Sequence, residues 1–442
     1  MNIGFLAMSG IRAHDPELLA LGLTLPGFVE RSRQIASLPS LGLLYLAAAT
    51  PPGHDLRYFE AESDGREPSE VYSCDLVAIS TFSAQVGEAY AIADRLRRAG
   101  VRVAMGGLHV SVRPEEAARH ADYVVTGEGE AVWPAVVAAA AAGAAPGRFD
   151  AKDAGPVDVA DLPVPRYDLL GDRPYNRFTV QTSRGCPWRC DFCASTVMLS
   201  RAYRKRPVSG VIRDIRAVMA LRDRPFIEFA DDNTFVDRAW GKELCRELAP
   251  LRLKWFTETD VSVADDPELL DLMAEAGCRQ VLIGLESPGA SALEGMEMRA
   301  NFKARRAGGY AAALRRIQAH GITVNGCFIL GLDEHGPEVF GQVLEYARSI
   351  PLYDVQITIL TPFPGTPLYD RLLAEGRLIE PERWDLCTLF DVNYRPKRMS
   401  VEELRGGIRW LTERLYGAEE TAARRKPFFA ALRRRPDHRP AA

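Results

Sequence analysis

The chain carries, from residue 178 to residue 193, the segment FTVQTSRGCPWRCDFC. Its beginning predicts a short strand, and the rest reads as a loop with three cysteines, Cys186, Cys190 and Cys193. The spacing of three and then two intervening residues allows a single loop to wrap an iron–sulfur cluster, with one thiolate on each iron. Three ligands for four irons leave one iron open, and an open position distinguishes a reactive metal site from a structural one. The segment therefore predicts a [4Fe–4S] cluster at the end of a strand.

Two other interpretations of the cysteines compete with the cluster. A structural zinc site needs a fourth ligand, and no other Cys or His lies within about 50 residues of the triplet, the nearest being His120 and Cys245. A redox pair formed by Cys190 and Cys193 would leave Cys186 without a role. The remaining cysteines stand singly and are interpreted as small core residues. They are Cys74, Cys245, Cys278, Cys327 and Cys387.

Outward from this segment, apolar strands alternate with helical stretches, and we expect one domain from residue 176 to residue 372. Six strands separated by helices predict a partial (β/α)6 barrel of the TIM type, with its chemistry at the carboxyl ends of the strands. The expected strands begin at Phe178 and then cover 226–230, 253–258, 280–285, 324–330 and 354–360.

A second α/β unit is expected from residue 1 to residue 150. Its predicted strands, 1–6, 76–80, 101–105 and 123–125, are separated by helices, which favours a Rossmann-like parallel sheet. Prolines mark a linker over residues 151–175, and residues 373–442 predict a helical region with a basic tail. The fold class is therefore α/β, with a Rossmann-like domain before the barrel.

Composition narrows the class of protein further. A length of 442 residues predicts two or three domains, and a net charge of −4 argues against nucleic acid or an anionic membrane as partner. No apolar run has the roughly 18 residues that a membrane span needs. The first residues lack the basic start and the cleavage site of a signal peptide, so we expect a cytoplasmic protein without a disulfide framework.

The cysteine spacing, together with Phe192 before the third cysteine, resembles the radical S-adenosylmethionine (SAM) superfamily. This resemblance implies that the open iron chelates the amino and carboxylate groups of SAM. Reduction of the cluster by a donor such as flavodoxin or ferredoxin then cleaves SAM to a 5′-deoxyadenosyl radical, which abstracts hydrogen from a small-molecule substrate. The cofactor supplies this chemistry, and the protein supplies orientation.

The resemblance also implies SAM-binding positions at later strand ends. Two aspartates stand where the superfamily often has a small acidic motif, and Cys327 replaces the customary first glycine of the fifth-strand motif. An acidic pair of this kind is otherwise a loop or capping feature, and a strand-end acid is otherwise simply solvated. The expected SAM-binding residues are Phe192, Asp231, Asp232, Glu286, Ser287, Gly331 and Glu334.

Residues 1–150 resemble the cobalamin-binding domain that precedes the barrel in one class of radical SAM enzymes. Glycines at strand ends let a flat macrocycle approach the backbone, and hydroxyls can bond its amide or phosphate groups. The Asp-x-His-x-x-Gly motif that supplies a protein ligand to cobalt is missing. The expected cobalamin-binding residues are Ser80, Thr81, Ser83, Gly106, Gly107, Gly127 and Glu128.

With cobalamin, the resemblance implies C-methylation of a natural product or of a lipid-like or tetrapyrrole-like molecule. The alternatives are a cobalamin-independent radical SAM cyclase, dehydratase or oxidoreductase and, from another class, an iron–sulfur electron-transfer or sensor protein. An electron-transfer protein would normally complete its cluster with a fourth ligand. No catalytic acid or base is predicted from the sequence.

Overall fold

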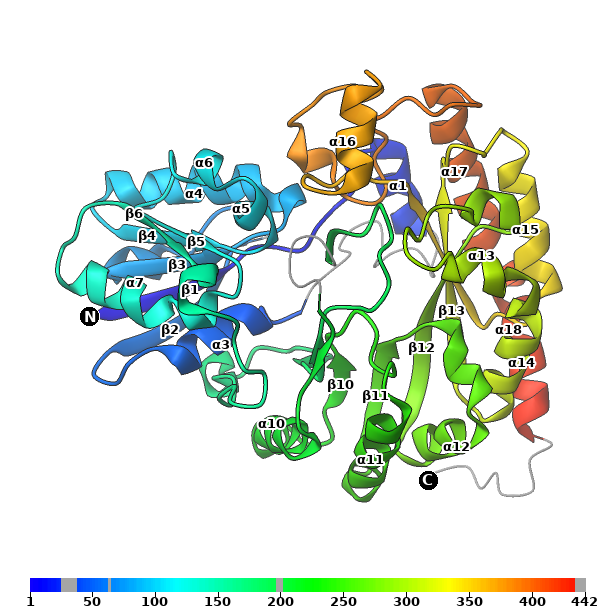
Figure 1. Cartoon of the computed structure of the whole chain (residues 1–442), viewed down its shortest axis with the longest axis horizontal. Coiled ribbons are helices and arrows are strands. Elements are labelled where there is room, and N and C mark those ends of the chain that lie inside the picture. Colours follow the sequence, from blue (N-terminus) through cyan, green and yellow to red (C-terminus); the bar gives the residue numbers. More distant parts are fainter. Residues whose placement is uncertain (25–37, 63–64, 196–201, 434–442) are drawn as a thin grey trace.

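The computed structural model describes residues 1–24, 38–62, 65–195 and 202–433. Two six-stranded sheets stand side by side, the first formed by the N-terminal part of the chain and the second by its middle (Figure 1). Helix α16 (Pro367–Ala374) and the chain around it lie over the junction between the two sheets (Figure 1).

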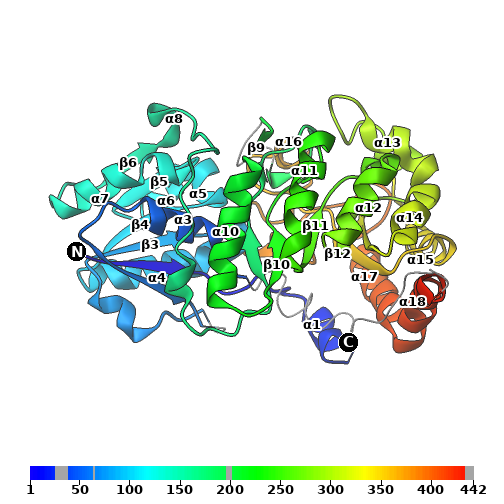
Figure 2. The same cartoon turned by 90° about the horizontal axis from the view of Figure 1, so that it is seen from below.

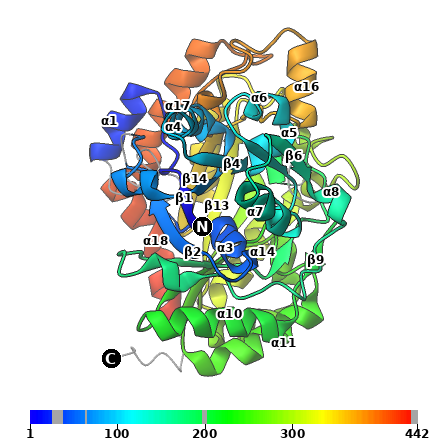
Figure 3. The same ribbon diagram turned by 90° about the vertical axis from the view of Figure 1, so that its left-hand side faces the viewer.

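The first sheet is parallel throughout, with the strand order β2-β1-β3-β4-β5-β6. Helices α4, α5 and α6 cover one face, and α3 and α7 cover the other (Figures 1 and 3). This doubly wound arrangement confirms the predicted Rossmann-like domain. The strands are β1 (Asn2–Ala7), β2 (Asp55–Glu60), β3 (Leu76–Ser80), β4 (Arg102–Gly106), β5 (Tyr123–Thr126) and β6 (Gly147–Asp150). The helices are α3 (Leu41–Ala49), α4 (Val86–Arg98), α5 (Leu108–Val112), α6 (Pro114–Ala117), α7 (Trp133–Ala141) and α8 (Ala151–Ala154).

Two strands of this sheet, β2 and β6, carry no clear signal in the sequence. Both lie at the edges, where one side of a strand faces solvent and the apolar content can be low. In β2 only Tyr58 and Phe59 are buried, and β6 has no fully buried residue. Pairing with β1 and with β5, rather than local composition, makes these segments strands.

The second sheet is also parallel, in the order β14-β13-β12-β11-β10-β7. Helices α10, α11, α12 and α14 stand in a row along its outer face (Figure 2). All six predicted strands are present, which confirms the partial (β/α)6 barrel. The strands are β7 (Phe178–Val180), β10 (Phe226–Phe229), β11 (Lys254–Glu258), β12 (Cys278–Glu286), β13 (Thr323–Leu330) and β14 (Asp354–Ile359). The helices are α10 (Val208–Leu221), α11 (Arg238–Leu248), α12 (Pro267–Glu275), α13 (Phe302–Arg306), α14 (Tyr310–Ala319) and α15 (Val339–Ser349).

Alternation along the strands fixes which side chains enter the barrel. Ile227, Phe229 and Trp255 are at most 1% exposed and pack in the core, with the Phe229 and Trp255 rings 5.2 Å apart. The residues between and beyond them, such as Glu228 and Glu258, are polar. Because successive side chains of a strand point to opposite faces, these carboxylates face the barrel interior.

The barrel is open, since within the described residues β7 pairs only with β10 and β14 only with β13. An unpaired edge strand leaves backbone groups that need partners. The buried Tyr416 hydroxyl supplies them on β14: it donates to the Val355 carbonyl (3.0 Å) and accepts from the Ile357 amide (3.3 Å). Tyr416 ends α17 (Val401–Tyr416), which is followed by α18 (Ala418–Arg433).

Capping residues start the outer helices directly after the loops that follow the strands. Asp237, Asp266 and Thr366 each accept a hydrogen bond from a first-turn amide, at the starts of α11, α12 and α16. Ser400 forms a capping box with Glu403 at the start of α17. The sequence thus marks where each of these helices begins.

The remaining segments join and flank the two sheets. Residues 151–175, predicted as a linker, contain α8 and a short turn of helix whose Tyr167 and Leu170 are buried. Helix α1 (Pro16–Thr24) contacts α17. The predicted basic tail, residues 434–442, lies outside the described residues. No helix in the described part of the chain is long and apolar enough to span a bilayer.

Candidate cofactor-binding site

The cysteine loop, residues 186–193, follows the first barrel strand. A two-stranded hairpin, β8 (Ser183–Arg184) with β9 (Arg204–Lys205), forms its base. None of the eight cysteines is in a disulfide, Cys190 is buried, and Cys186 and Cys193 are half-buried. Burial raises the pKa of Cys186 to about 12, and the three thiols also act on one another electrostatically. The loop therefore gathers three protected thiols at the carboxyl end of the barrel.

This donor set fits a [4Fe–4S] cluster. Each thiolate binds a different iron, so the three sulfurs need not converge on one point. Convergence is what a single ion requires, and among the described residues no three His, Cys, Asp or Glu side chains are arranged to hold one. Phe192, expected near SAM, lies in the same loop and packs against the core.

A second segment, residues 296–303, runs against the cysteine loop and is called the strap here. The Met298 amide donates to the Arg189 carbonyl (2.9 Å), and the Asp191 amide donates to the Met296 carbonyl (2.9 Å). Across the same contact, Trp188 of the loop stacks on Phe302 of the strap with ring centroids 4.0 Å apart. The strap therefore fixes the loop's shape from a point more than 100 residues later in the chain.

The buried Glu297 carboxylate fastens the strap to the loop. It accepts the Arg189 amide of the loop (3.0 Å) and the amides of Arg299 (3.0 Å), Ala300 (2.7 Å) and Phe302 (3.3 Å). These hydrogen bonds outweigh burial and lower the pKa of Glu297. No local motif marks Glu297 as a contact to the loop, because its partner there, the Arg189 amide, lies 108 residues earlier in the chain.

Asp231 holds the start of the hairpin instead of an open ligand position. One carboxylate oxygen accepts the amides of Thr182 (2.8 Å) and Ser183 (2.9 Å). The other accepts the hydroxyls of Thr182 and Thr234 (2.9 Å). Burial raises the pKa of Asp231 to about 6 against these bonds. Four donors occupy the four acceptor positions of a carboxylate, so Asp231 has none left for SAM.

Asp232 and Glu258 have fewer hydrogen-bond partners than Asp231, and both face the barrel interior. Asp232 accepts a hydrogen bond from Ser195 and acts electrostatically on Cys186. The pKa of Glu258 rises to about 8, because surrounding protein desolvates it and the carboxylates of Asp232 and Glu228 lie near it. Its side chain keeps solvent contact and has no side-chain partner among the described residues. The sequence did not single out Glu258 as a binding residue, although the end of this strand, residues 255–260, resembles a SAM-binding position of the family.

At the end of β12, Glu286 pairs with Lys303 of the strap. The Glu286 backbone is left-handed, with φ +64°, which turns the side chain at the strand end. Next to it, the Ser287 hydroxyl lies 3.0 Å from His335 Nε2. Burial lowers the pKa of His335 to about 4, and its Nδ1 accepts the Leu332 amide (3.3 Å), so neutral His335 donates through Nε2 to Ser287.

The last two expected SAM residues face the C-terminal region. Gly331 has φ +85°, and an added Cβ would lie 2.0 Å from the Tyr394 hydroxyl, which donates to the Gly331 carbonyl (2.7 Å). Glu334 forms an exposed ion pair with Arg398 (2.5 Å). Neither is brought to the cysteine loop by any contact in the described structure, so their expected SAM roles gain no support from the geometry.

The carboxyl edge of the first sheet presents glycines and one exposed aromatic ring. Gly107 has φ +100°, and an added Cβ would lie 2.7 Å from the Thr81 carbonyl, so only glycine fits there. Gly106 precedes it, and Gly127 (φ +77°) begins the loop after β5. Phe82 is 47% exposed at the end of β3. A flat edge with an uncovered apolar ring fits a macrocycle such as cobalamin.

The polar residues expected to bind cobalamin differ in whether their hydroxyl groups could reach a ligand. Thr81 and Ser83 are buried; Thr81 donates to the Phe82 carbonyl (2.9 Å), and Ser83 lies 3.0 Å from His109 Nδ1. Ser80 remains half-buried beside Gly107. Of this group, only Ser80 is placed where a ligand at the edge could reach its hydroxyl.

Glu128 joins the two sheets. Its carboxylate accepts Arg184 (2.8 Å) and Arg204 (3.2 Å) of the hairpin, and Arg184 also reaches Glu130 (2.6 Å). Glu128 follows β5, and Arg184 precedes Cys186 by two residues, so the carboxyl edges of the two sheets meet here (Figure 1). Deeper in the same junction, the fully buried Arg206 pairs with Asp214 (2.6 Å) and bonds the Tyr45 hydroxyl (2.8 Å).

The segment around Trp384, in the C-terminal region, packs against the helices α4, α5 and α6 of the first domain. Trp384 donates to Glu116 (3.2 Å) and contacts the buried His109 edge to face, with centroids 5.2 Å apart. His109 thus connects Ser83, beside the glycine edge, with Trp384 of the C-terminal region.

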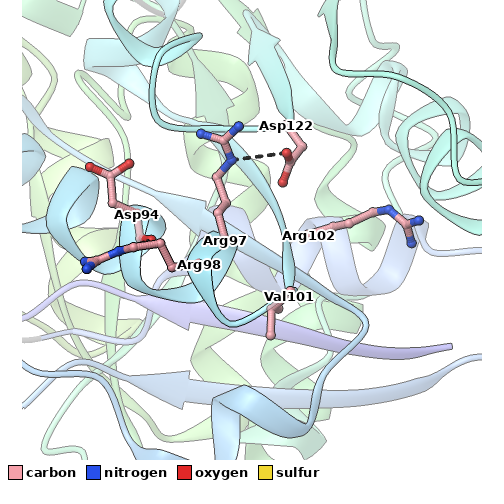
Figure 4. A pocket seen from close by; sticks show the side chains of 7 residues that line it. Asp94, Arg97, Arg98, Val101, Arg102 and Asp122 are labelled. Carbon is pink, nitrogen blue, oxygen red and sulfur yellow. Dashed lines mark hydrogen bonds and ion pairs between the residues drawn. The ribbon is translucent and has the colours of Figure 1, made fainter.

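One basic hollow lies far from this site. It has a volume of about 590 Å³ and is lined by Asp94, Arg97, Arg98, Arg102 and Asp122 (Figure 4). Arg102 begins β4 and Asp122 precedes β5, which places the hollow at the amino edge of the first sheet. Arg97 is neutralised by Asp122 at 3.1 Å. The hollow therefore cannot bring a ligand to the cysteine loop.

Comparisons with known protein families match separate parts of the chain. The B12 binding domain family matches residues 36–137, and the Radical SAM superfamily matches residues 180–347. A domain of unknown function, DUF4070, matches residues 366–442.

Among curated proteins, the chain is 24% identical over 371 residues to the bacteriochlorophyllide d C-12(1)-methyltransferase of Chlorobaculum tepidum, covering 82% of this chain and 79% of the relative. It is 28% identical over 357 residues to the hopanoid C-2 methylase of Rhodopseudomonas palustris, covering 78% and 66%. Among solved structures, the radical SAM methyltransferase TsrM of Kitasatospora setae, with cobalamin and a [4Fe–4S] cluster bound, is similar with a TM-score of 0.64. The identity is 18%, over 85% of this chain and 78% of that one.

Proposed function

The chain belongs to the radical SAM superfamily and carries a B12-binding domain ahead of its barrel, and from this premise we propose that it is a cobalamin-dependent C-methyltransferase. When bound, the cluster and SAM would supply a 5′-deoxyadenosyl radical, and cobalamin would carry the methyl group. The protein's own part is to hold these groups on facing edges and to keep water from them.

One observation carries the proposal: the glycine edge of the first sheet and the cysteine loop are joined directly. The Glu128–Arg184 contact (2.8 Å) spans only the loop after β5 and the two residues before Cys186. Both partners are largely buried, with side chains 16% and 11% exposed, so the contact is protected from solvent screening. A substrate between the edges would meet the radical on one side and the methyl carrier on the other.

We assign the side chains at the barrel edge as follows. Cys186, Cys190 and Cys193 would bind three irons of the cluster. Asp232 and Glu258 would accept hydrogen bonds from the SAM ammonium and ribose, because their carboxylates face the interior without being saturated. Glu286 would share this role through the oxygen that Lys303 does not occupy, while Asp231 positions the loop.

For the substrate we propose an apolar polycyclic natural product. The two curated relatives are named for a bacteriochlorophyllide and a hopanoid, and both are large ring systems with few charges. Phe82, exposed at the edge of the first domain, would contact either the corrin or such a substrate. We also propose that the enzyme works in the cytoplasm and receives electrons from a flavodoxin or ferredoxin.

Methyl-labelled SAM tests the proposal without knowledge of the substrate. The full-length protein would be reconstituted anaerobically with iron, sulfide and hydroxocobalamin, reduced, and incubated with the labelled SAM. We expect S-adenosylhomocysteine in solution and label in the protein-bound corrinoid fraction, together with 5′-deoxyadenosine from slow uncoupled cleavage.

Protein that forms 5′-deoxyadenosine but binds no corrinoid would refute methyl transfer and leave the cobalamin-independent radical SAM chemistries. Protein that forms neither product would refute the proposal entirely. A preparation without hydroxocobalamin is the matched control, since it should still cleave SAM but release no S-adenosylhomocysteine.

A further inference from the structure

Lys303 is an enclosed cation beside the cysteine loop that the proposed chemistry has not yet used. It follows Phe302, whose ring stacks on Trp188 of the loop at 4.0 Å. Its side chain is 15% exposed, and its ammonium bonds the Glu286 carboxylate and the Gly284 carbonyl (3.1 Å). The strap therefore delivers a positive charge to the end of β12, next to the loop.

Space for this charge is built into the barrel at Gly284. A Cβ added at Gly284 would lie 2.9 Å from Lys303 Nζ and 2.2 Å from the Glu286 carboxylate. Since real Cβ atoms do not approach so closely, a larger residue here would displace both charged groups from their present positions. With side chains only 15% and 7% exposed, the Lys303–Glu286 pair is enclosed and is not a surface contact.

The charged groups near Cys190 differ in sign from those near Cys186. Burial raises the pKa of Cys190, whereas the Lys303 ammonium acts on the same thiol in the opposite direction. Cys186 faces Asp232 and Asp260, which are both negative and disfavour its thiolate. Lys303 thus opposes a predominantly acidic environment from the Cys190 side.

We propose that Lys303 raises the reduction potential of the [4Fe–4S] cluster held by the cysteine loop, so that a one-electron donor can reduce it. A cluster with three thiolates changes from a net charge of −1 to −2 when its core gains one electron from the donor, which is itself oxidised by one electron. A neighbouring ammonium stabilises the more negative state more strongly, and a low local dielectric strengthens the effect. This inference rests on the cluster of the proposed function.

The partner carboxylate, Glu286, makes it possible to distinguish an effect of charge on the reduction potential from a purely structural role of the pair. Its carboxylate partly cancels the Lys303 charge at the cluster, so loss of either partner shifts the potential in opposite directions. Lys303→Met should make the potential more negative, and Glu286→Gln should make it more positive. The double variant should return close to the wild-type value, because both charges are gone.

The test is a redox titration of the full-length, cluster-reconstituted protein with dithionite, without SAM, followed by electron paramagnetic resonance. Lys303→Arg keeps the charge and should match the wild type. Lys242→Met is the matched control, because it breaks another lysine–carboxylate contact, with Asp266 (3.0 Å), on the outer helix α11, and it should shift nothing.

Shifts of opposite sign in the two single variants, at wild-type iron content, support the inference. Equal midpoints, or shifts of the same sign, would overturn it. If Lys303→Met does not fold, Glu286→Gln decides alone: a positive shift supports the inference, and none refutes it. Wild-type protein that holds no four-iron cluster would instead refute the proposed function, which iron and sulfide analysis distinguishes.

Discussion

The carboxyl edges of the two sheets are built on different principles. The barrel edge presents thiols and carboxylates, several of them enclosed and with shifted pKa values, as for the buried Asp231 at about 6. The first sheet's edge presents glycine backbone, with its expected hydroxyls mostly turned inward, as for Ser83 beside His109. The barrel edge can therefore recognise its cofactor by chemistry and charge, and the first edge by shape. If this comparison holds, the two edges should fail independently.

The largest expected effect comes from the barrel edge. Cys190→Ala should abolish cluster binding and SAM cleavage. The loss of activity should exceed the roughly 100-fold that is typical when a residue beside a metal ligand is replaced. Residues 1–150 should remain folded and still bind hydroxocobalamin, because β1 to β6 pair without the loop. Iron content, 5′-deoxyadenosine and the corrinoid absorption spectrum are the measurements.

Cys245→Ala is the matched control for that variant. Cys245 is also buried but lies on the outer helix α11, so its replacement should lower stability only through lost packing and leave the iron content unchanged. Appreciable SAM cleavage by Cys190→Ala would show that another ligand holds the cluster.

The next effect tests the first edge by its shape. Gly107→Ala should weaken hydroxocobalamin binding and destabilise the protein by more than about 1–3 kcal/mol, the cost of holding a non-glycine residue in the backbone conformation of Gly107 (φ +100°, ψ −173°). The excess arises because the new Cβ meets Thr81 backbone atoms at 2.7 and 2.8 Å. Binding is measured by corrinoid titration and stability by chemical denaturation, with the iron content expected to stay at the wild-type value.

Gly100→Ala separates backbone strain from lost space. It has a similar φ of +86° but no atom within 4 Å of its Cβ position, so it should cost only the strain and leave corrinoid affinity intact. If both glycine variants lose corrinoid equally, shape at the edge is not what recognises it.

A smaller effect is expected where the edges meet. Glu128→Gln weakens the charge-assisted contacts to Arg184 and Arg204, which are worth about 1.5–3 kcal/mol. Each cofactor should still bind, while S-adenosylhomocysteine formation falls more than 5′-deoxyadenosine formation. Glu115→Gln, which removes one exposed pair with Arg148, is the control and should change neither product. Equal losses of both products would show that Glu128 serves the fold and not the alignment of the edges.

The smallest effects divide the two aspartates. Asp232→Asn should weaken SAM affinity severalfold, with stability near the wild-type value. Asp231→Asn should instead lower stability, because an amide cannot accept the four donors that the carboxylate holds. Isothermal titration with SAM and thermal unfolding would separate the two, and the reverse pattern would exchange their roles.

The features of the fold and the site that could be predicted from the sequence are those marked by residues close together in the chain. The barrel strands were predicted because their apolar runs pack on helices, and the cysteines because their spacing is chemical. Asp231 and Asp232 could not be told apart, since adjacent residues share every local signal and only the fold separates anchor from ligand. Glu297 gave no signal, because its contact with the loop spans 108 residues of the chain. Lys303 gave none, because its pairing with Glu286 depends on how the strap folds back onto the end of β12.

The central claim is that the cysteine loop leaves one iron open for SAM, and electron paramagnetic resonance of the reduced, full-length protein tests it most directly. Spectra would be recorded with and without SAM, including SAM labelled with ¹⁷O in its carboxylate. The account predicts that SAM shifts the cluster signal and that the label couples magnetically to the cluster. Identical spectra in a protein with full iron content would contradict it.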